Sequence, residues 1–280
     1  MQLRDIIKEF KELFKENYAD LKILISDIKG IPVNKLILSD CELNESEVKK
    51  LNQYVEEYRT GKPIDKIINE SIFYGYKFFV NEHVLSPRMD TEIIIDAVHD
   101  IKKRSDNFKV MDICTGSGVI LITILNEFKN ASGIGIDISD QALLVSEKNS
   151  FINNVNERCR FLKQDILHGI KMEKDEKYDV IVSNPPYIKT KDIKILDESV
   201  RKYDPLIALD GGDDGTLYYE KILMNIKPFI DENSIIIFEI GYDIECEVKE
   251  LIKQYGFYLV KEYKDIQNIT RVLTLKCKDI

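Results

Sequence analysis

Apolar residues over positions 1–70 recur at helical spacing. The first stripe has the repeat expected of the buried face of an amphipathic helix and comprises Ile6, Ile7, Phe10, Leu13 and Phe14. A second stripe, which ends before Gly30-Ile31-Pro32, comprises Leu21, Leu24, Ile25 and Ile28. A third helix is expected from Asn44 or Ser46, either of which suits a helix N-cap, to about Arg59. The pattern predicts a small all-helical domain over residues 1–70.

From Ile72 onward, apolar residues recur at every second position, as in a β-strand, and no longer at helical spacing. The run Phe73–Val80 is mostly aromatic, with Gly75 near its centre, and this pattern is typical of a β-hairpin. We expect residues 71–86 to form a hairpin that links the helical domain to the rest of the chain.

Strands and helices alternate after Ser86-Pro87-Arg88. Strands are predicted over Lys109–Ile113, Gly133–Ile136, Arg160–Lys163, Asp179–Ser183, Ser234–Glu239, Phe257–Val260 and Arg271–Lys276. Helices are predicted over Val119–Phe128, Asp140–Asn153, Leu217–Phe229 and Ile244–Tyr255. This alternation predicts an α/β domain over residues 87–280 with a Rossmann-like, doubly wound and mostly parallel sheet.

The composition and net charge limit the classes of protein to which this chain can belong. The 280 residues include 44% hydrophobic and 32% charged side chains, as in ordinary soluble proteins. No apolar run reaches the roughly 20 residues that span a bilayer, and the first residues lack a signal-peptide pattern. We therefore expect a cytoplasmic protein without a membrane partner. The net charge of −9 argues against a protein that binds nucleic acid over its whole surface, because phosphate binding needs clustered Lys and Arg, but it leaves room for a small local basic patch.

The cysteines do not form a recognisable framework. They are odd in number, widely spaced and without a C-x-x-C pair: Cys41, Cys114, Cys159, Cys246 and Cys277. The three histidines are also dispersed, so we expect neither disulfides nor a metal site.

A glycine-containing loop follows the first predicted strand of the sheet. Its small residues allow a ligand to approach the backbone closely: Cys114, Thr115, Gly116, Ser117 and Gly118. The dinucleotide fingerprint G-x-G-x-x-G is absent, because Cys114 and Leu121 replace its first and third glycines. Instead Asp112 precedes the loop, where it is placed to approach the cationic amino end of a ligand. A dinucleotide has no such group.

Acidic residues also end the next two strands. Asp137 is placed to accept hydrogen bonds from two ribose hydroxyls, and Asp165 from an adenine amine while Ile166 packs against the ring. A single acid at a strand end is usually a solvated loop residue. Three at successive strand ends of one sheet indicate a nucleoside site, because ligands bind at that edge.

The fourth predicted strand runs into the tetrapeptide Asn184-Pro185-Pro186-Tyr187. The two prolines restrict the backbone and remove two donors, which leaves the Asn184 side-chain oxygen and the Pro185 carbonyl as acceptors. Such a pair suits a planar NH2 group, which could be held in line with a sulfonium methyl group. Tyr187 could stack on the flat group. The alternative is a proline-rich turn without a catalytic role.

These motifs resemble those of the release-factor glutamine methyltransferases, and the resemblance covers about Lys62–Leu275. Its further marks are Gly61-Lys62-Pro63, Phe78-Phe79-Val80, Val84–Arg88, Asp90-Thr91-Glu92, Asp204–Leu209, Gly211–Gly215 and Phe238–Gly241. The element around Arg88–Glu92 is more specific than the tetrapeptide, which amino-methylating DNA enzymes share.

The resemblance implies a class I methyltransferase that uses S-adenosylmethionine and releases S-adenosylhomocysteine. Its substrate would be the glutamine of the Gly-Gly-Gln motif in peptide chain release factors, received by the helical domain. Asn184 and Pro185 would hold the glutamine amide, with Asn184 also bordering the cofactor, and the remaining substrate contacts would be Pro186, Tyr187, Arg88 and Glu92. The cofactor would lie against Thr115, Gly116, Gly118, Asp137 and Asp165.

Three positions depart from the family pattern. Cys114 replaces the usual first glycine, Met89 replaces a proline or similar residue, and the stretch Lys264–Arg271 lacks a glycine. At Cys114 we expect a negative φ and a buried, unreactive thiol.

Two other functions would share parts of this pattern. An adenine-N6 or ribosomal RNA methyltransferase would share the tetrapeptide but would need a basic nucleic-acid surface, and the sequence has no basic run. A binding module that only docks a translation factor would not need Asn184, which is present.

Overall fold

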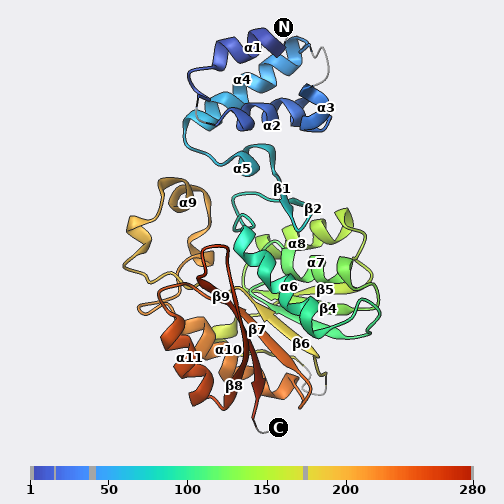
Figure 1. Ribbon diagram of the computed structural model, residues 1–280, viewed down its shortest axis with the longest axis vertical. Coiled ribbons are helices and arrows are strands. Elements are labelled where there is room, and N and C mark those ends of the chain that lie inside the picture. Colours follow the sequence, from blue (N-terminus) through green and yellow to red (C-terminus); the bar gives the residue numbers. More distant parts are fainter. Residues whose placement is uncertain (1–2, 16, 38–41, 173–175, 279–280) are drawn as a thin grey trace. The chain divides into compact units, whose positions relative to one another are not determined.

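The computed structural model describes residues 3–15, 17–37, 42–172 and 176–278 (Figure 1). The chain divides into two compact units, Met1–Glu70 and Ser71–Ile280. Cys41 of the sequence analysis lies outside the described residues. Within them, no helix is long and apolar enough to cross a membrane.

The first unit is a bundle of short helices. They are α1 (Leu3–Phe10), α2 (Tyr18–Lys29), α3 (Val33–Ile37), α4 (Glu45–Arg59) and α5 (Ile64–Ile68). Both apolar stripes supply its core, in which Phe14, Leu21 and Leu24 are fully buried. The first helix ends at Phe10, earlier than the stripe, and a turn carries Phe14 into the core.

The helix ends of this unit follow from their capping residues. Asn44, not Ser46, caps α4, because its side chain accepts from the Glu47 amide while the Glu47 carboxylate accepts from the Asn44 amide. Helix α2 ends at Gly30, whose φ of 64° is the left-handed conformation that glycine adopts without strain.

A hairpin is present as β1 (Glu70–Phe73) and β2 (Tyr76–Phe79), and it is shorter than the predicted range of residues 71–86. Its turn residues Tyr74 and Gly75 both have positive φ, as a two-residue type I′ hairpin turn requires. The Phe79 amide donates to the Asn149 side-chain oxygen at 2.6 Å, which fixes the hairpin to helix α8 of the second unit.

The second unit contains a seven-stranded sheet in the order β5-β4-β3-β6-β7-β9-β8. Its strands are β3 (Lys109–Ile113), β4 (Ser132–Asp137), β5 (Cys159–Lys163), β6 (Val180–Ser183), β7 (Ile235–Glu239), β8 (Phe257–Lys264) and β9 (Thr270–Cys277). All neighbours from β5 to β7 are parallel, and β9 is antiparallel to both β7 and β8. The predicted doubly wound, mostly parallel sheet is confirmed.

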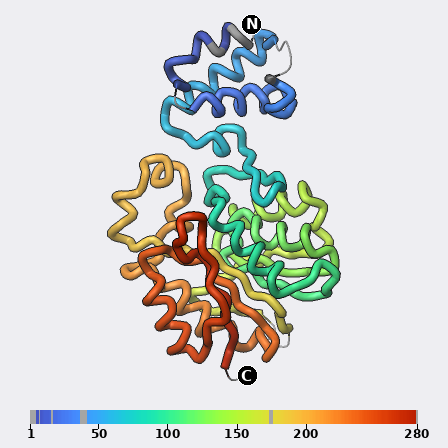
Figure 2. The backbone as a smooth tube through the Cα atoms, viewed as in Figure 1, coloured from blue at the N-terminus to red at the C-terminus, as the bar shows by residue number. Residues whose placement is uncertain are grey.

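Helices cover both faces of this sheet. They are α6 (Glu92–Ile101), α7 (Val119–Glu127), α8 (Asp140–Ile152), α10 (Leu217–Asn225) and α11 (Glu245–Gln254). The short helix α9 (Glu198–Tyr203) lies apart from the sheet, in the segment between β6 and α10 (Figure 1). Helices α6, α7 and α8 lie on one side of the sheet, and α10 and α11 on the other (Figures 1 and 2, green and orange). Alternate residues of β3 enter the two cores, with Val110 packing with α6 and α7, and Met111 with α10 and α11. Helices α6 and α9 were missed by the sequence analysis.

The strand order reverses at β3, and this creates the crevice that holds the site. From β3 the chain proceeds through β4 to β5 on one side and then crosses back to β6 on the other. Ligands of open α/β sheets bind outside the carboxyl ends of the strands at this switch point. Ile113 lies beside Ile136 of β4 and Ser183 of β6, so the segments that follow these three strands meet at one edge.

Close packing beside β3 gives a prediction about stability. A Cβ atom on Gly133 would lie 2.5 Å from the Val110 carbonyl oxygen and 2.7 Å from Leu121 Cδ1. Because one of these atoms is backbone, Gly133→Ala should lower the free energy of unfolding by about 1–3 kcal/mol in urea titrations. Ser132→Ala, one residue away on the same strand, is the matched control. Equal stability of both variants would mean that the sheet adapts freely at Gly133.

Candidate active site

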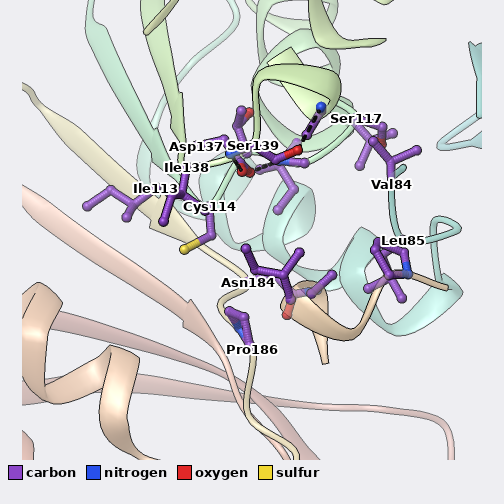
Figure 3. Close-up of a pocket in the computed structure, with 18 of the residues that line it drawn as sticks. Val84, Leu85, Ile113, Cys114, Ser117, Asp137, Ile138, Ser139, Asn184 and Pro186 are labelled. Carbon is purple, nitrogen blue, oxygen red and sulfur yellow. Dashed lines mark hydrogen bonds between the residues drawn. The ribbon is translucent and has the colours of Figure 1, made fainter. Parts of the chain in front are cut away.

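A pocket opens at the carboxyl ends of β3, β4, β5 and β6 (Figure 3). It encloses about 1000 Å³ of empty space, including its open mouth. The wall is formed by the loop after β3, the ends of β4 and β5, the tetrapeptide, and the segments 83–88 and 205–208. Figure 3 shows Asp137 and Ser139 on one side of this pocket and Asn184 and Pro186 on the other.

The loop after β3 turns sharply into α7. Cys114, Gly116 and Gly118 have φ values of 61°, 56° and 79°, so left-handed residues alternate along it. The expected negative φ at Cys114 is therefore wrong. The reversal from strand to helix requires this conformation, which a non-glycine residue adopts at a cost of about 1–2 kcal/mol.

The Cys114 side chain is half-buried and lines the pocket with Thr115, Gly116 and Ser117. Burial raises the pKa of its thiol well above the ordinary value, which favours the protonated, weakly nucleophilic form. Gly118 lies at the start of α7 and does not line the pocket.

Asp112 lies beneath the loop, fully buried, and does not line the pocket wall. One carboxyl oxygen accepts from the Thr115 hydroxyl at 2.6 Å and from the Leu121 amide at 3.4 Å. The other oxygen has no hydrogen-bond partner among the described residues. Burial raises the pKa of this carboxyl to about 7, against the effect of the two hydrogen bonds. In this arrangement Asp112 holds the loop through Thr115.

Asp137 ends β4 and lines the pocket directly. Its two oxygens accept from the Gly116 and Ser139 amides, each at 2.9 Å. Burial raises the pKa of the Asp137 carboxyl, and these backbone hydrogen bonds oppose that effect. The carboxyl group thus joins the loop after β3 to the end of β4.

Asp165 and Ile166 follow β5, and both line the pocket. Ile166 is buried, and the Asp165 carboxyl accepts from the Leu167 amide at 3.0 Å. The second Asp165 oxygen lies 2.6 Å from His168 Nδ1, a contact that the sequence analysis did not foresee. The two acids that line the pocket, Asp137 and Asp165, therefore follow neighbouring strands, whereas Asp112, the third acid of the predicted set, lies beneath the loop.

The tetrapeptide is fixed to the neighbouring strand and loop. The Ser183 hydroxyl donates to the Ile113 carbonyl at 2.6 Å, which ties the end of β6 to β3. Asn184 and Pro186 line the pocket, whereas Pro185 and Tyr187 are not part of its wall. The ring of Tyr187 packs beside Gly241, and a Cβ atom on Gly211 would lie 2.6 Å from Tyr187 Cα. The structure therefore places the tyrosine ring in packing contact behind the loop.

Arg88 and Glu92 are placed differently from each other. Arg88 lines the pocket and donates to the carboxylate of Asp204 at 3.1 Å. Glu92 accepts from the Tyr74 amide at 2.6 Å, so it contacts the hairpin and not the pocket.

Two polar residues behind Asn184 received no role in the sequence analysis. Thr91 is buried, lines the pocket and accepts from Asn184 Nδ2 at 3.3 Å. Glu239 ends β7 and is 3% exposed. Burial raises the pKa of Glu239 to about 7, while hydrogen bonds from Thr91 and Asn184 act in the opposite direction. The signal was present, because an acid that ends an apolar strand also identified Asp137.

Comparisons with known proteins agree with this architecture. The methyltransferase small domain family matches residues 89–204. A methyltransferase from Pyrococcus furiosus, 16% identical, aligns in its crystal structure with a TM-score of 0.55 over 80% of this chain and 100% of its own. Such a likeness shows the Rossmann-like fold of class I methyltransferases.

Curated relatives match almost the whole chain. The release factor glutamine methyltransferase of Agrobacterium fabrum is 32% identical over 92% of this chain and 90% of its own length. That of Clostridium acetobutylicum is 33% identical over 98% of both chains. Identity of this extent, with the fold and the pocket described above, leads to one conclusion: the chain belongs to the release factor glutamine methyltransferase family.

Proposed function

We propose that this protein transfers the methyl group of S-adenosylmethionine to the side-chain amide nitrogen, N5, of the glutamine in the Gly-Gly-Gln motif of peptide chain release factors. The observation that carries the proposal is the position of Asn184. Its side chain lies in the same pocket as Asp137, across from the loop after β3.

The residues of the pocket fit the parts of S-adenosylmethionine. Asp137 would accept from the ribose hydroxyls, since each carboxylate oxygen has more than one acceptor site and only one is used by a backbone amide. Asp165 and Ile166 would bind the adenine edge and face. The loop 114–117 would lie along the methionine part, with Asp112 acting from below through Thr115. When bound, S-adenosylmethionine would supply the methyl group from its sulfonium sulfur.

The chemical difficulty of the reaction explains why the tetrapeptide would be needed. An amide nitrogen is a poor nucleophile because its lone pair is delocalised into the carbonyl group. Asn184 Oδ1 and the Pro185 carbonyl would accept the two amide hydrogens, orient the nitrogen and stabilise the positive charge that grows on it. The nitrogen lone pair would form the new bond to the methyl carbon, the carbon–sulfur electron pair would stay on sulfur to give S-adenosylhomocysteine, and one amide proton would be lost to solvent.

The direct test uses purified full-length protein, labelled S-adenosylmethionine and an intact release factor. Mass spectrometry should find a single added methyl group on the glutamine of Gly-Gly-Gln. Adenine-containing DNA and ribosomal RNA serve as parallel substrates. Methylation of nucleic acid without methylation of the factor would favour the adenine-N6 alternative and contradict the proposal.

Asn184→Ala should lower methyl transfer by about 10²–10⁴-fold, the scale of losing one positioned contact to developing charge. Calorimetry should show nearly unchanged cofactor affinity, because the residues proposed to bind the nucleoside are intact. Asn184→Asp keeps an acceptor and should retain part of the activity. If Asn184→Ala transferred methyl groups at nearly the parental rate, the tetrapeptide would be a turn without a catalytic role.

Asp137→Ala should weaken cofactor binding by about 2–4 kcal/mol in calorimetry, as expected for charged hydrogen-bond partners. Part of this loss would come from the Gly116 amide, which loses its acceptor at 2.9 Å. Lys163→Ala, whose ammonium pairs with exposed Asp140, is a charge control that should bind normally. Unchanged affinity in Asp137→Ala would remove this residue from the site.

We further propose that residues 1–70 contribute to docking of the protein substrate. This unit has its own apolar core, and none of the residues lining the pocket belongs to it. Removal of the unit should raise KM for intact release factor much more than KM for a short Gly-Gly-Gln peptide. Denaturant unfolding of the remaining chain is the control for its integrity. Equal losses on both substrates would show that the unit serves stability only.

A further inference from the structure

The side chain of Asn184 has two ends of nearly equal shape, and only one of them suits the proposed reaction. The oxygen accepts hydrogen bonds, whereas the NH2 group only donates. A substrate amide that donates two hydrogens therefore needs the oxygen in the pocket. Which end points there is decided by the partners of the other end.

Thr91 is the first such partner, but it cannot decide the orientation alone. Its hydroxyl accepts from Asn184 Nδ2 at 3.3 Å. A threonine hydroxyl has one donor and two acceptor sites, so it could donate to a reversed carboxamide equally well. Thr91 fixes the orientation of the Asn184 carboxamide only if its hydroxyl proton is already donated to another acceptor.

Glu239 lies where it can take that proton. Strands β6 and β7 are parallel, with Ser183 opposite Phe238, so Asn184 and Glu239 occupy the next positions along the two strands. Hydrogen bonding to the side chains of Thr91 and Asn184 lowers the pKa of the Glu239 carboxyl, against the larger effect of burial. Its backbone carbonyl accepts from the buried Tyr219 hydroxyl at 2.7 Å, which holds the end of β7 in place.

The burial of Glu239 is costly for stability. The residue is 3% exposed, and its Oε2 atom has no hydrogen-bond partner among the described residues. The nearby guanidinium of Arg271 is engaged by Asp265 at 2.8 Å and Asp90 at 3.3 Å. An incompletely paired buried carboxyl destabilises a fold, so a role in the site explains its presence better than a role in stability.

We propose that Glu239 is a positioning residue that fixes the orientation of the Asn184 carboxamide through Thr91. The inference rests on the proposed function, since it concerns the residue that would hold the substrate amide. An ionised carboxylate only accepts hydrogen bonds, so it draws the Thr91 proton and the Asn184 NH2 group towards itself. The Thr91 lone pair then faces Asn184 Nδ2, and Asn184 Oδ1 is left for the pocket.

A double-mutant cycle tests this role. Glu239→Leu in the full-length protein should lower kcat on a Gly-Gly-Gln peptide by about 10–100-fold, the effect of a misplaced reacting group, with cofactor affinity unchanged. The Asn184→Asp variant has no NH2 group that could turn towards the substrate. In that background, Glu239→Leu should lower kcat by less than about 3-fold. Glu239→Gln retains an acceptor oxygen and should stay within about 5-fold of its parent. If Glu239→Leu lowered kcat by the same factor in both backgrounds, the inference would be overturned.

Thr91 supplies a second cycle that does not depend on the folding of Glu239→Leu. Thr91→Val should lower kcat and Thr91→Ser should restore it, again only when position 184 is Asn. Thr274→Val is the matched control, because it removes an equally buried hydroxyl that bonds to the Lys261 carbonyl on the edge of the sheet. A similar loss in Thr274→Val would show that buried hydroxyls matter only through stability.

A readout without turnover separates this inference from the proposed function. The side-chain NH2 resonance of Asn184, identified by its absence in Asn184→Asp, should exchange slowly with solvent protons and faster in Glu239→Leu and Thr91→Val. If the native protein fails to methylate the peptide, the proposed function is wrong, and slow exchange would still support the orientation. Fast exchange in the native protein would overturn the inference even if methylation occurs.

Discussion

The parallel pairing of β3 with both β4 and β6 is the constraint on which the site depends. Ile113 lies beside Ile136 and Ser183, and the Ser183 hydroxyl holds the two central strands together at their carboxyl ends. A shift of either strand by one residue would turn its side chains to the opposite face and separate the loop 114–118 from Asn184. The reaction that we propose needs these two elements at one place, one beside the nucleoside and the other beside the methyl acceptor.

Two buried carboxyl groups position the two halves of this pocket in the same way. Asp112 accepts from the Thr115 hydroxyl under the loop after β3, and hydrogen bonding to Thr91, behind Asn184, lowers the pKa of the Glu239 carboxyl. Burial raises the pKa of each to about 7, and each has one oxygen without a partner among the described residues. Because both carboxyl groups are buried and incompletely paired, both lower the stability of the fold, as is common for residues that serve a functional site.

Much of this arrangement could be predicted because strands and their ends leave local signals. The alternation of apolar strands and amphipathic helices predicted the sheet, and acids at strand ends predicted the positions of Asp137 and Asp165. The left-handed φ of Cys114, the packing of Tyr187 behind its loop and the partner of Glu92 could not be predicted, since they arise from contacts between distant segments. The order of β9 and β8 at the sheet edge is set by tertiary packing in the same way.

The central claim is that Asn184 holds a glutamine amide across from the cofactor. A crystal structure with S-adenosylhomocysteine and a Gly-Gly-Gln peptide tests it most directly. We predict that the glutamine amide nitrogen lies within hydrogen-bond distance, about 2.7–3.2 Å, of both Asn184 Oδ1 and the Pro185 carbonyl oxygen and faces the sulfur atom. A glutamine side chain bound elsewhere, or an Asn184 amide nitrogen turned towards the peptide, would contradict the account.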